Sequence, residues 1–70
     1  MMPLTLAGNG EEHIILRVGG SPELKRHMED LGFVPGSTVT VINQLGGNII
    51  LSVKQSRVAI SREMAQKIFI

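Results

Sequence analysis

The chain has 70 residues, enough for one domain and no second one. Seven Lys and Arg against six Asp and Glu leave a net charge of +1 without any block of like charge, so we expect no nucleic-acid partner. The absence of cysteine excludes a disulfide, a thiolate metal site and a cysteine nucleophile.

The first ten residues are weakly patterned, and the Gly8-Asn9-Gly10 run is typical of a loop. We therefore expect a flexible or short-strand arm over residues 1–10 and one domain over residues 11–70. The start lacks the basic and long apolar segments of a signal peptide, and no apolar run reaches the ~20 residues that span a bilayer. We expect a cytoplasmic protein that is not embedded in the membrane.

Residues 12–18 alternate as a half-buried strand does. The expected core face carries Ile14, Leu16 and Val18. The opposite face carries His13, Ile15 and Arg17. Gly19-Gly20 then ends this strand.

The next segment predicts a helix that begins at Pro22. Ser21 can cap it with its hydroxyl, Pro22 suits the first helical position, and Glu23 favours the positive end of the helix dipole. One apolar stripe is formed by Leu24, Met28 and Leu31. The helix should therefore bury one face and expose the other.

The sequence also contains residues that are typical of a helix C-terminus. The helix is expected to end at Leu31 or Gly32, because Gly32 can adopt a left-handed conformation and Phe33 can fold back onto Met28 in a Schellman cap. Pro35-Gly36 are the two central residues that a type II turn requires, and residues 38–42 are then a β-branched strand.

The remaining residues predict further antiparallel strands. Gly46-Gly47-Asn48 is expected to be the loop of a hairpin between residues 38–42 and 49–53, and Gln55-Ser56 to connect onward to a strand over residues 57–60. Ser61 can cap a single helical turn that reaches Ala65, and residues 67–70 return as a short strand.

The fold class follows from this count of about five short antiparallel strands and one inserted α-helix. Short strands in a small chain either expose their edges or close, and closure is the common solution. We predict a mainly β protein that forms a small β-barrel.

Two segments carry a resemblance to a known family. Leu31-Gly32-Phe33-Val34-Pro35-Gly36-Ser37-Thr38-Val39-Thr40-Val41 and the closing segment from Arg57 to Ile70 resemble the FeoA family, the small cytoplasmic accessory proteins of bacterial ferrous iron transport. The likeness covers residues 11–70 and implies that the barrel is SH3-like. Similar domains occur at the C-terminus of DtxR-type metal-dependent repressors, so the fold alone does not fix the role.

The resemblance implies a non-enzymatic protein that docks on the cytoplasmic, G-protein-containing part of the transporter FeoB to support or regulate iron uptake. The alternative is a regulatory module that senses metal or a peptide, as in the repressors. Family members often have a proline near the loop between the two long strands, and residues 45–48 have none, which puts any contact through a rigid proline loop in doubt.

No catalytic group can be placed from spacing, and we expect no enzyme activity. The carboxylates are dispersed, at Glu11, Glu12, Glu23, Glu29, Asp30 and Glu63. Neither a general acid and base pair nor an activated nucleophile follows from these positions.

The predicted helix carries a candidate metal site. Glu23 and His27 are four residues apart and Asp30 lies three further on, so they share a face and can hold a divalent cation such as Fe²⁺ weakly. His13 adds a ligand only if the fold brings it near. Ordinary solvated residues are the favoured interpretation of these donors.

A protein-binding surface is the stronger hypothesis. The chain has no Trp and no Tyr, so it lacks the aromatic groove with which an SH3 domain binds polyproline, and Phe33 and Phe69 are expected in the core. The candidate contacts for a partner are Lys25, Arg26, Glu29 and Arg62. The oligomeric state stays open.

Overall fold

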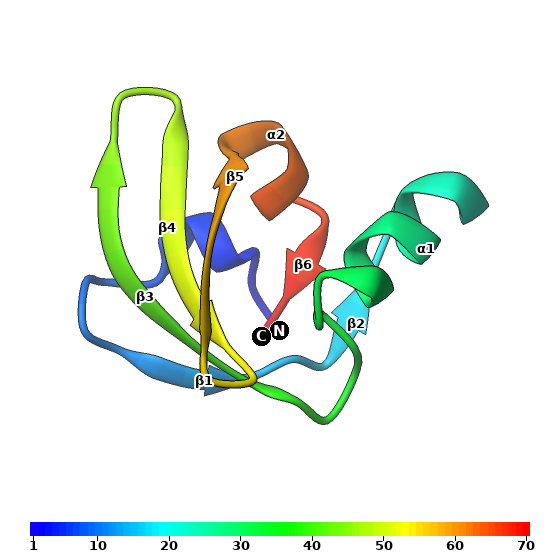
Figure 1. Ribbon diagram of the computed structural model, residues 1–70, viewed down its shortest axis with the longest axis horizontal. Coiled ribbons are helices and arrows are strands. Elements are labelled where there is room, and N and C mark those ends of the chain that lie inside the picture. Colours follow the sequence, from blue (N-terminus) through cyan, green and yellow to red (C-terminus); the bar gives the residue numbers. More distant parts are fainter.

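The computed structural model describes residues 1–70, the whole chain (Figure 1). Six strands, two α-helices and one 3-10 helix follow one another. Their bounds are η1 Leu4–Leu6, β1 Glu12–Ile14, β2 Arg17–Val18, α1 Pro22–Asp30, β3 Thr38–Leu45, β4 Asn48–Val53, β5 Ser56–Ser61, α2 Arg62–Ala65 and β6 Ile68–Phe69. The fold is mainly β with α1 inserted between β2 and β3, as predicted.

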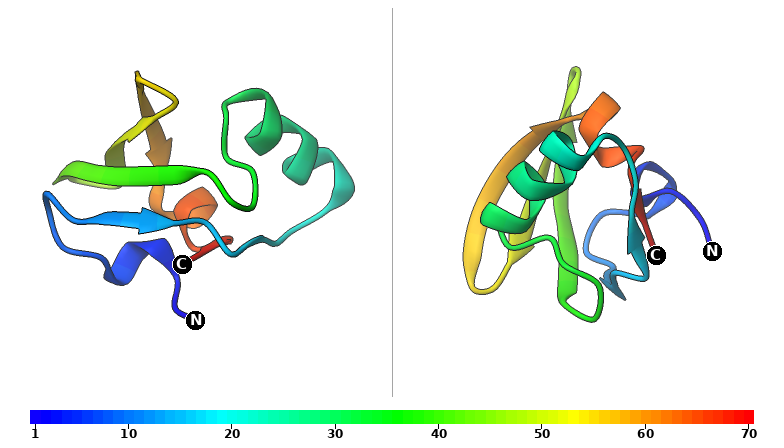
Figure 2. Two further views of the ribbon diagram at one scale, coloured as in Figure 1. Left: turned by 90° about the horizontal axis from the view of Figure 1, so that it is seen from below. Right: turned by 90° about the vertical axis from the view of Figure 1, so that its right-hand side faces the viewer.

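The strands form two antiparallel sheets. Four strands pair in the order β1-β3-β4-β5, and β2 pairs with β6. The expected closure into a barrel is wrong, because no ladder joins β5 to the two-stranded sheet. Both sheets instead curve around one core with their edges left separate (Figures 1 and 2).

The predicted strand over residues 12–18 is split, and its core face is wrong at Ile14 and Leu16, whereas Val18 is buried as predicted. Ile15 is fully buried, whereas Ile14 is 58% and Leu16 is 54% exposed. The chain changes partner at this point: Ile15 N–H donates to the carbonyl of Ser37 at 2.9 Å, and Leu16 N–H donates to that of Phe69 at 2.7 Å. Because the two halves belong to different sheets, the alternation does not run through the break.

Helix α1 begins where the sequence predicts and ends at Asp30, one residue before the expected Leu31. Ser21 Oγ accepts from the N–H of Leu24 at 3.2 Å, and Leu31 is the C-cap residue. Gly32 follows with φ +102°, and its N–H donates to the carbonyl of Glu29 at 2.9 Å. The N–H of Phe33 donates to the carbonyl of Met28 at 2.9 Å, which completes the Schellman cap.

The turns that follow are mostly as expected. Gly36 has φ +91° and Ser37 N–H donates to the carbonyl of Val34 at 3.0 Å, as in a type II turn. The β3–β4 loop is Gly46-Gly47. The β4–β5 loop is Lys54-Gln55, one residue earlier than predicted, with positive φ at both residues.

The first ten residues differ from the flexible or short-strand arm expected of them. Leu4, in η1, is fully buried. Met2 and Ile70 exchange backbone hydrogen bonds of 2.9 and 2.8 Å, and Pro3 forms an isolated bridge with Phe69. The two termini consequently lie side by side (Figure 1).

The core consists of apolar residues alone. Fifteen buried apolar residues from both sheets, η1, both α-helices and the loops form one cluster, and no polar or charged residue is buried. Every side chain that can take part in recognition by charge is therefore on the surface.

Candidate functional site

The predicted metal ligands lie on two different elements. Glu23, His27 and Asp30 are exposed on α1, as their spacing predicts. His13 lies on β1, on another side of the molecule from α1 (Figures 1 and 2). No group of three or more His, Asp or Glu side chains in the chain is close enough to hold a metal ion.

His13 has a different partner, one that the sequence analysis missed. Its Nε2 lies 3.0 Å from Oε1 of Glu11, and the same carboxylate oxygen accepts from the N–H of Gly8 at 3.0 Å. The hydrogen bond with His13, followed by that from Gly8, lowers the pKa of Glu11 below its ordinary value of 4.5. This pair fixes the turn that leads into β1.

The predicted partner contacts are all exposed, but the fold separates them. Lys25, Arg26 and Glu29 lie on α1. Arg62 opens α2, and its Nη1 donates to Oε1 of Gln44 at 3.0 Å. Because α1 projects to one side of the sheets and α2 follows β5 (Figure 1), these residues form two surfaces.

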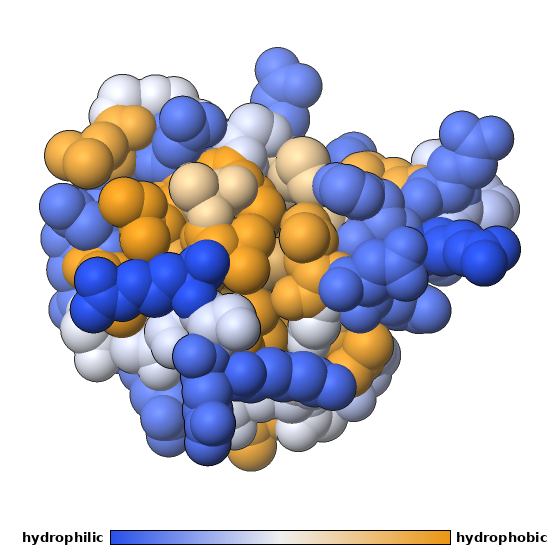
Figure 3. All heavy atoms as spheres, in the orientation of Figure 1, coloured by the Kyte–Doolittle hydropathy of each residue, from blue (hydrophilic) through white to orange (hydrophobic).

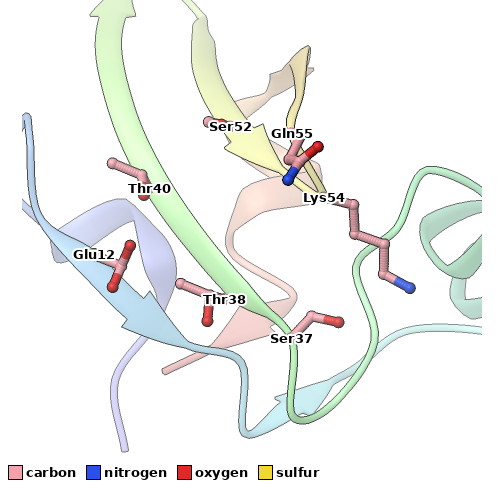
Figure 4. Close-up of a pocket in the computed structure, with 7 residues that line it drawn as sticks. All are labelled: Glu12, Ser37, Thr38, Thr40, Ser52, Lys54 and Gln55. Carbon is pink, nitrogen blue, oxygen red and sulfur yellow. The ribbon is translucent and has the colours of Figure 1, made fainter.

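A polar groove lies on the outer face of the four-stranded sheet (Figure 4). It has a volume of about 330 Å³ and no apolar lining residue. The lining residues are Glu12, Ser37, Thr38, Thr40, Ser52, Lys54 and Gln55. The sequence signal for this groove was the polar half of the alternation in β3 and β4, which marks a solvated face.

Apolar surface gathers across the middle of another face, over β4, β5 and α2, while hydrophilic side chains cover α1 (Figure 3). Val58 on β5 and Met64 on α2 are half-buried and pack against the core, as do Leu24 and Leu31 on and beside α1. A contiguous apolar patch on a surface is a candidate site for contact with another protein, whereas single half-buried side chains are ordinary.

Phe33 and Phe69 occupy different environments. Phe33 is fully buried, as predicted. Phe69 is only half-buried, and the guanidinium of Arg17 lies 4.6 Å from its ring centroid. The contact is a cation–π pair that covers the ring rather than a groove of aromatic side chains.

The structural comparisons define the class first: this is a small SH3-like domain. It superposes with a TM-score of 0.85 on Stenotrophomonas maltophilia FeoA, a prokaryotic SH3 domain protein solved with zinc, covering 99% of this chain and 88% of that one at 20% identity. A manganese-dependent transcriptional repressor matches with a TM-score of 0.89 at 20% identity, over 97% of this chain and 39% of that one. Both likenesses show the fold alone.

Sequence comparison then gives the family. The model of the FeoA domain matches residues 2–70, so the chain belongs to the FeoA family. A relative from Methanocaldococcus jannaschii, named "Putative Fe(2+) transport protein A", is 34% identical over 70 residues, which are 100% of this chain and 85% of that one. The predicted resemblance is confirmed. No helix in the structure is both long enough and apolar enough to cross a membrane.

Proposed function

We propose that this chain is a non-enzymatic accessory protein of ferrous iron transport that works in the cytoplasm. It docks on the cytoplasmic part of a FeoB-type transporter, which contains the G-protein domain, and thereby supports or regulates iron uptake. The observation that carries this proposal is the FeoA family match over residues 2–70, together with the 34% identical relative named "Putative Fe(2+) transport protein A".

The surface of the molecule is compatible with docking. Charged side chains on α1 and α2 are exposed, and the apolar side chains beside them are only half-buried. We propose Lys25, Arg26, Glu29 and Arg62 as contacts for the transporter. Such exposed charges affect the association rate and the salt dependence more than the affinity.

The test is uptake of labelled ferrous iron by cells that lack this gene but keep the transporter. Expression of the wild-type chain should restore uptake. A variant with Lys25 and Arg26 both changed to Glu should restore it less well, while Lys67→Glu, an exposed charge change outside the proposed contacts, should act as wild type. Equal uptake with and without the protein would refute the proposal.

The second candidate is a regulatory module that senses metal or a peptide. The shared fold with the manganese-dependent repressor favours it. On this account His27 on α1 binds Fe²⁺ weakly with no more than one of its helix neighbours Glu23 and Asp30, because the structure does not bring three such side chains together. His13 lies at a separate position on β1. Anaerobic titration with Fe²⁺, followed through the ring signals of both histidines by NMR, should then move His27 and leave the His27→Gln variant silent. No change below millimolar Fe²⁺ would exclude it.

A further inference from the structure

The outer edge of β5 is an open strand edge. β5 is the last strand in the order β1-β3-β4-β5, so only β4 pairs with it. Figure 1 shows β5 in front of β4, with no strand along its other side. Most proteins protect such an edge, because its free backbone groups accept any strand that fits.

The register shows which groups point outward. Residues Val53 and Ser56 flank the two-residue β4–β5 loop and pair with each other. In a hairpin of this kind the closing pair is hydrogen-bonded and the pairs then alternate. The backbone groups of Arg57 and Ala59 therefore face away from β4, and none of the hydrogen bonds outside the helices and strands involves them.

Neither a bulge nor a proline protects this edge. The six pairs between β4 and β5 run in unbroken register, without a bulge, and β5 contains no proline. Ala59 is exposed and small, so it offers no obstacle to a neighbouring strand. Arg57 is exposed and has no ion pair, since the one salt bridge of the molecule joins Glu11 and His13.

We propose that the free edge of β5 binds an extended segment of a partner protein as a fifth strand of the sheet. The segment has a carboxylate opposite Arg57 and apolar side chains opposite Val58 and Ile60. Arg57 and Ala59 lie on the outer face, so alternate residues of the segment meet the cation there. The other residues of the bound segment point toward the half-buried side chain of Val58 and the apolar surface seen in Figure 3.

Charge decides against a second copy of this chain as the occupant. If two copies paired antiparallel about Ala59, Arg57 of each would face Ser61 of the other, beside its Arg62. β5 itself carries no carboxylate that could pair with Arg57, and the next acidic residue along the chain is Glu63, on α2. Lys54, at the β4–β5 loop, adds a further cation without an ion pair. An acidic segment from a different protein meets these charges favourably.

The inference concerns how a segment is bound and does not depend on which protein supplies it. The test uses a short blocked peptide in which Val and Glu alternate, titrated into the ¹⁵N-labelled protein. The largest amide shifts should fall on Arg57 and Ala59. A peptide with Lys in place of Glu should bind about threefold more weakly, as expected for a cross-strand charge pair.

Two variants separate this mode from nonspecific binding. Ala59→Pro removes an outward N–H that β4 does not use, so the fold should persist while peptide affinity falls about tenfold, the equivalent of one hydrogen bond. Arg57→Glu should reverse the preference between the two peptides, whereas Lys67→Glu, a matched charge change away from β5, should not.

Three outcomes would overturn the proposal: peptide shifts centred elsewhere, affinity that Ala59→Pro leaves unchanged in a folded protein, or self-association of the wild-type protein that Ala59→Pro abolishes. The last would make a second copy the occupant. Because the peptide is independent of the transporter, this proposal and the proposed function can fail separately.

Discussion

Residues 21–41 and residues 1–18 show two ways in which this chain specifies structure. In the first region, each element is bounded by residues that act on their neighbours, such as the Ser21 cap and the Gly32 turn. In the second region, the chain pairs mainly with distant residues: the N–H of Leu16 donates to the carbonyl of Phe69, and Met2 exchanges backbone hydrogen bonds with Ile70. The structure of residues 21–41 can be predicted from the sequence because its interactions are local. The structure of residues 1–18 cannot, because it depends on residues far along the chain.

The largest expected loss of stability comes from a substitution of Phe33, within residues 21–41. Phe33 is fully buried and donates the backbone bond that closes the α1 cap. Phe33→Ala should lower the free energy of unfolding by about 3–5 kcal/mol, enough to unfold much of so small a domain. Urea unfolding followed by circular dichroism measures this. Phe69→Ala, at a half-buried ring, should cost less, and an equal loss would contradict the assignment.

The next effect tests whether the first ten residues belong to the fold. Leu4→Ala removes a fully buried side chain and should cost about 2–5 kcal/mol. The matched control lies in the same 3-10 helix: Leu6 is 68% exposed, and Leu6→Ala should change stability by no more than about 0.5 kcal/mol. Similar small losses from both variants would mean that this segment is detached in solution.

A third pair of variants measures backbone strain within residues 21–41. Gly32→Ala and Gly36→Ala place a side chain at φ +102° and +91°, where L residues are strained, and each should cost about 1–2 kcal/mol. A Cβ at Gly36 would have no atom within 4 Å, and one at Gly32 would make only ordinary contacts. Thermal unfolding should therefore give nearly equal losses. A much larger loss at Gly32 would point to a clash.

The two serine caps give a smaller effect. Ser21 caps α1 and Ser61 caps α2, each through an acceptor bond of 3.2 Å. Changing either to Ala should cost about 1 kcal/mol, and Ser to Asp at the same position should retain the cap. Amide hydrogen exchange in the first turn of each helix should rise with the Ala variants alone. Unchanged exchange would show that the cap bonds are not formed.

The smallest expected effect is a pH-dependent change in stability that arises from Glu11, within residues 1–18. The folded pKa of Glu11 is lowered, so its contribution to stability is present above about pH 4.5 and is lost as the pH falls through the folded pKa. Glu11→Gln should remove that part of the pH dependence and leave stability in strong acid unchanged. Thermal unfolding from neutral to acid pH measures it. Identical profiles for both proteins would show that the bonds to His13 and Gly8 add nothing.

The same contrast explains what the sequence predicted. The α1 caps, the Pro35-Gly36 turn and the Gly46-Gly47 hairpin were correct because each depends on residues within a few positions of each other. The core face of residues 12–18 was wrong because the change of partner after Ile14 is decided by Ser37 and Phe69, far along the chain. The Lys54-Gln55 loop was placed one residue late because neither residue is a Gly or Asn that would mark a turn of positive φ.

The candidate sites divide in the same way. Exposure of Lys25, Arg26 and Glu29 followed from helical spacing. The pairing of His13 with Glu11 is local, but the spacing of the two residues does not specify the side-chain rotamers that form it. The polar groove and the free edge of β5 depend on the sheet order, which no single strand encodes. The sheet order also decides which strand lacks a neighbour, and so which backbone groups remain open.

The most direct test of the central proposal is an NMR titration of the ¹⁵N-labelled protein with the cytoplasmic domain of its FeoB-type transporter. We expect the transporter domain alone, without added iron, to shift the amides around Lys25, Arg26 and Glu29 on α1 and those near Arg62 on α2. The shifts on α1 should weaken when Lys25 and Arg26 are both changed to Glu. An unchanged spectrum at a saturating excess of that domain, with shifts near His27 when ferrous iron alone is added, would contradict docking and favour a metal-sensing module.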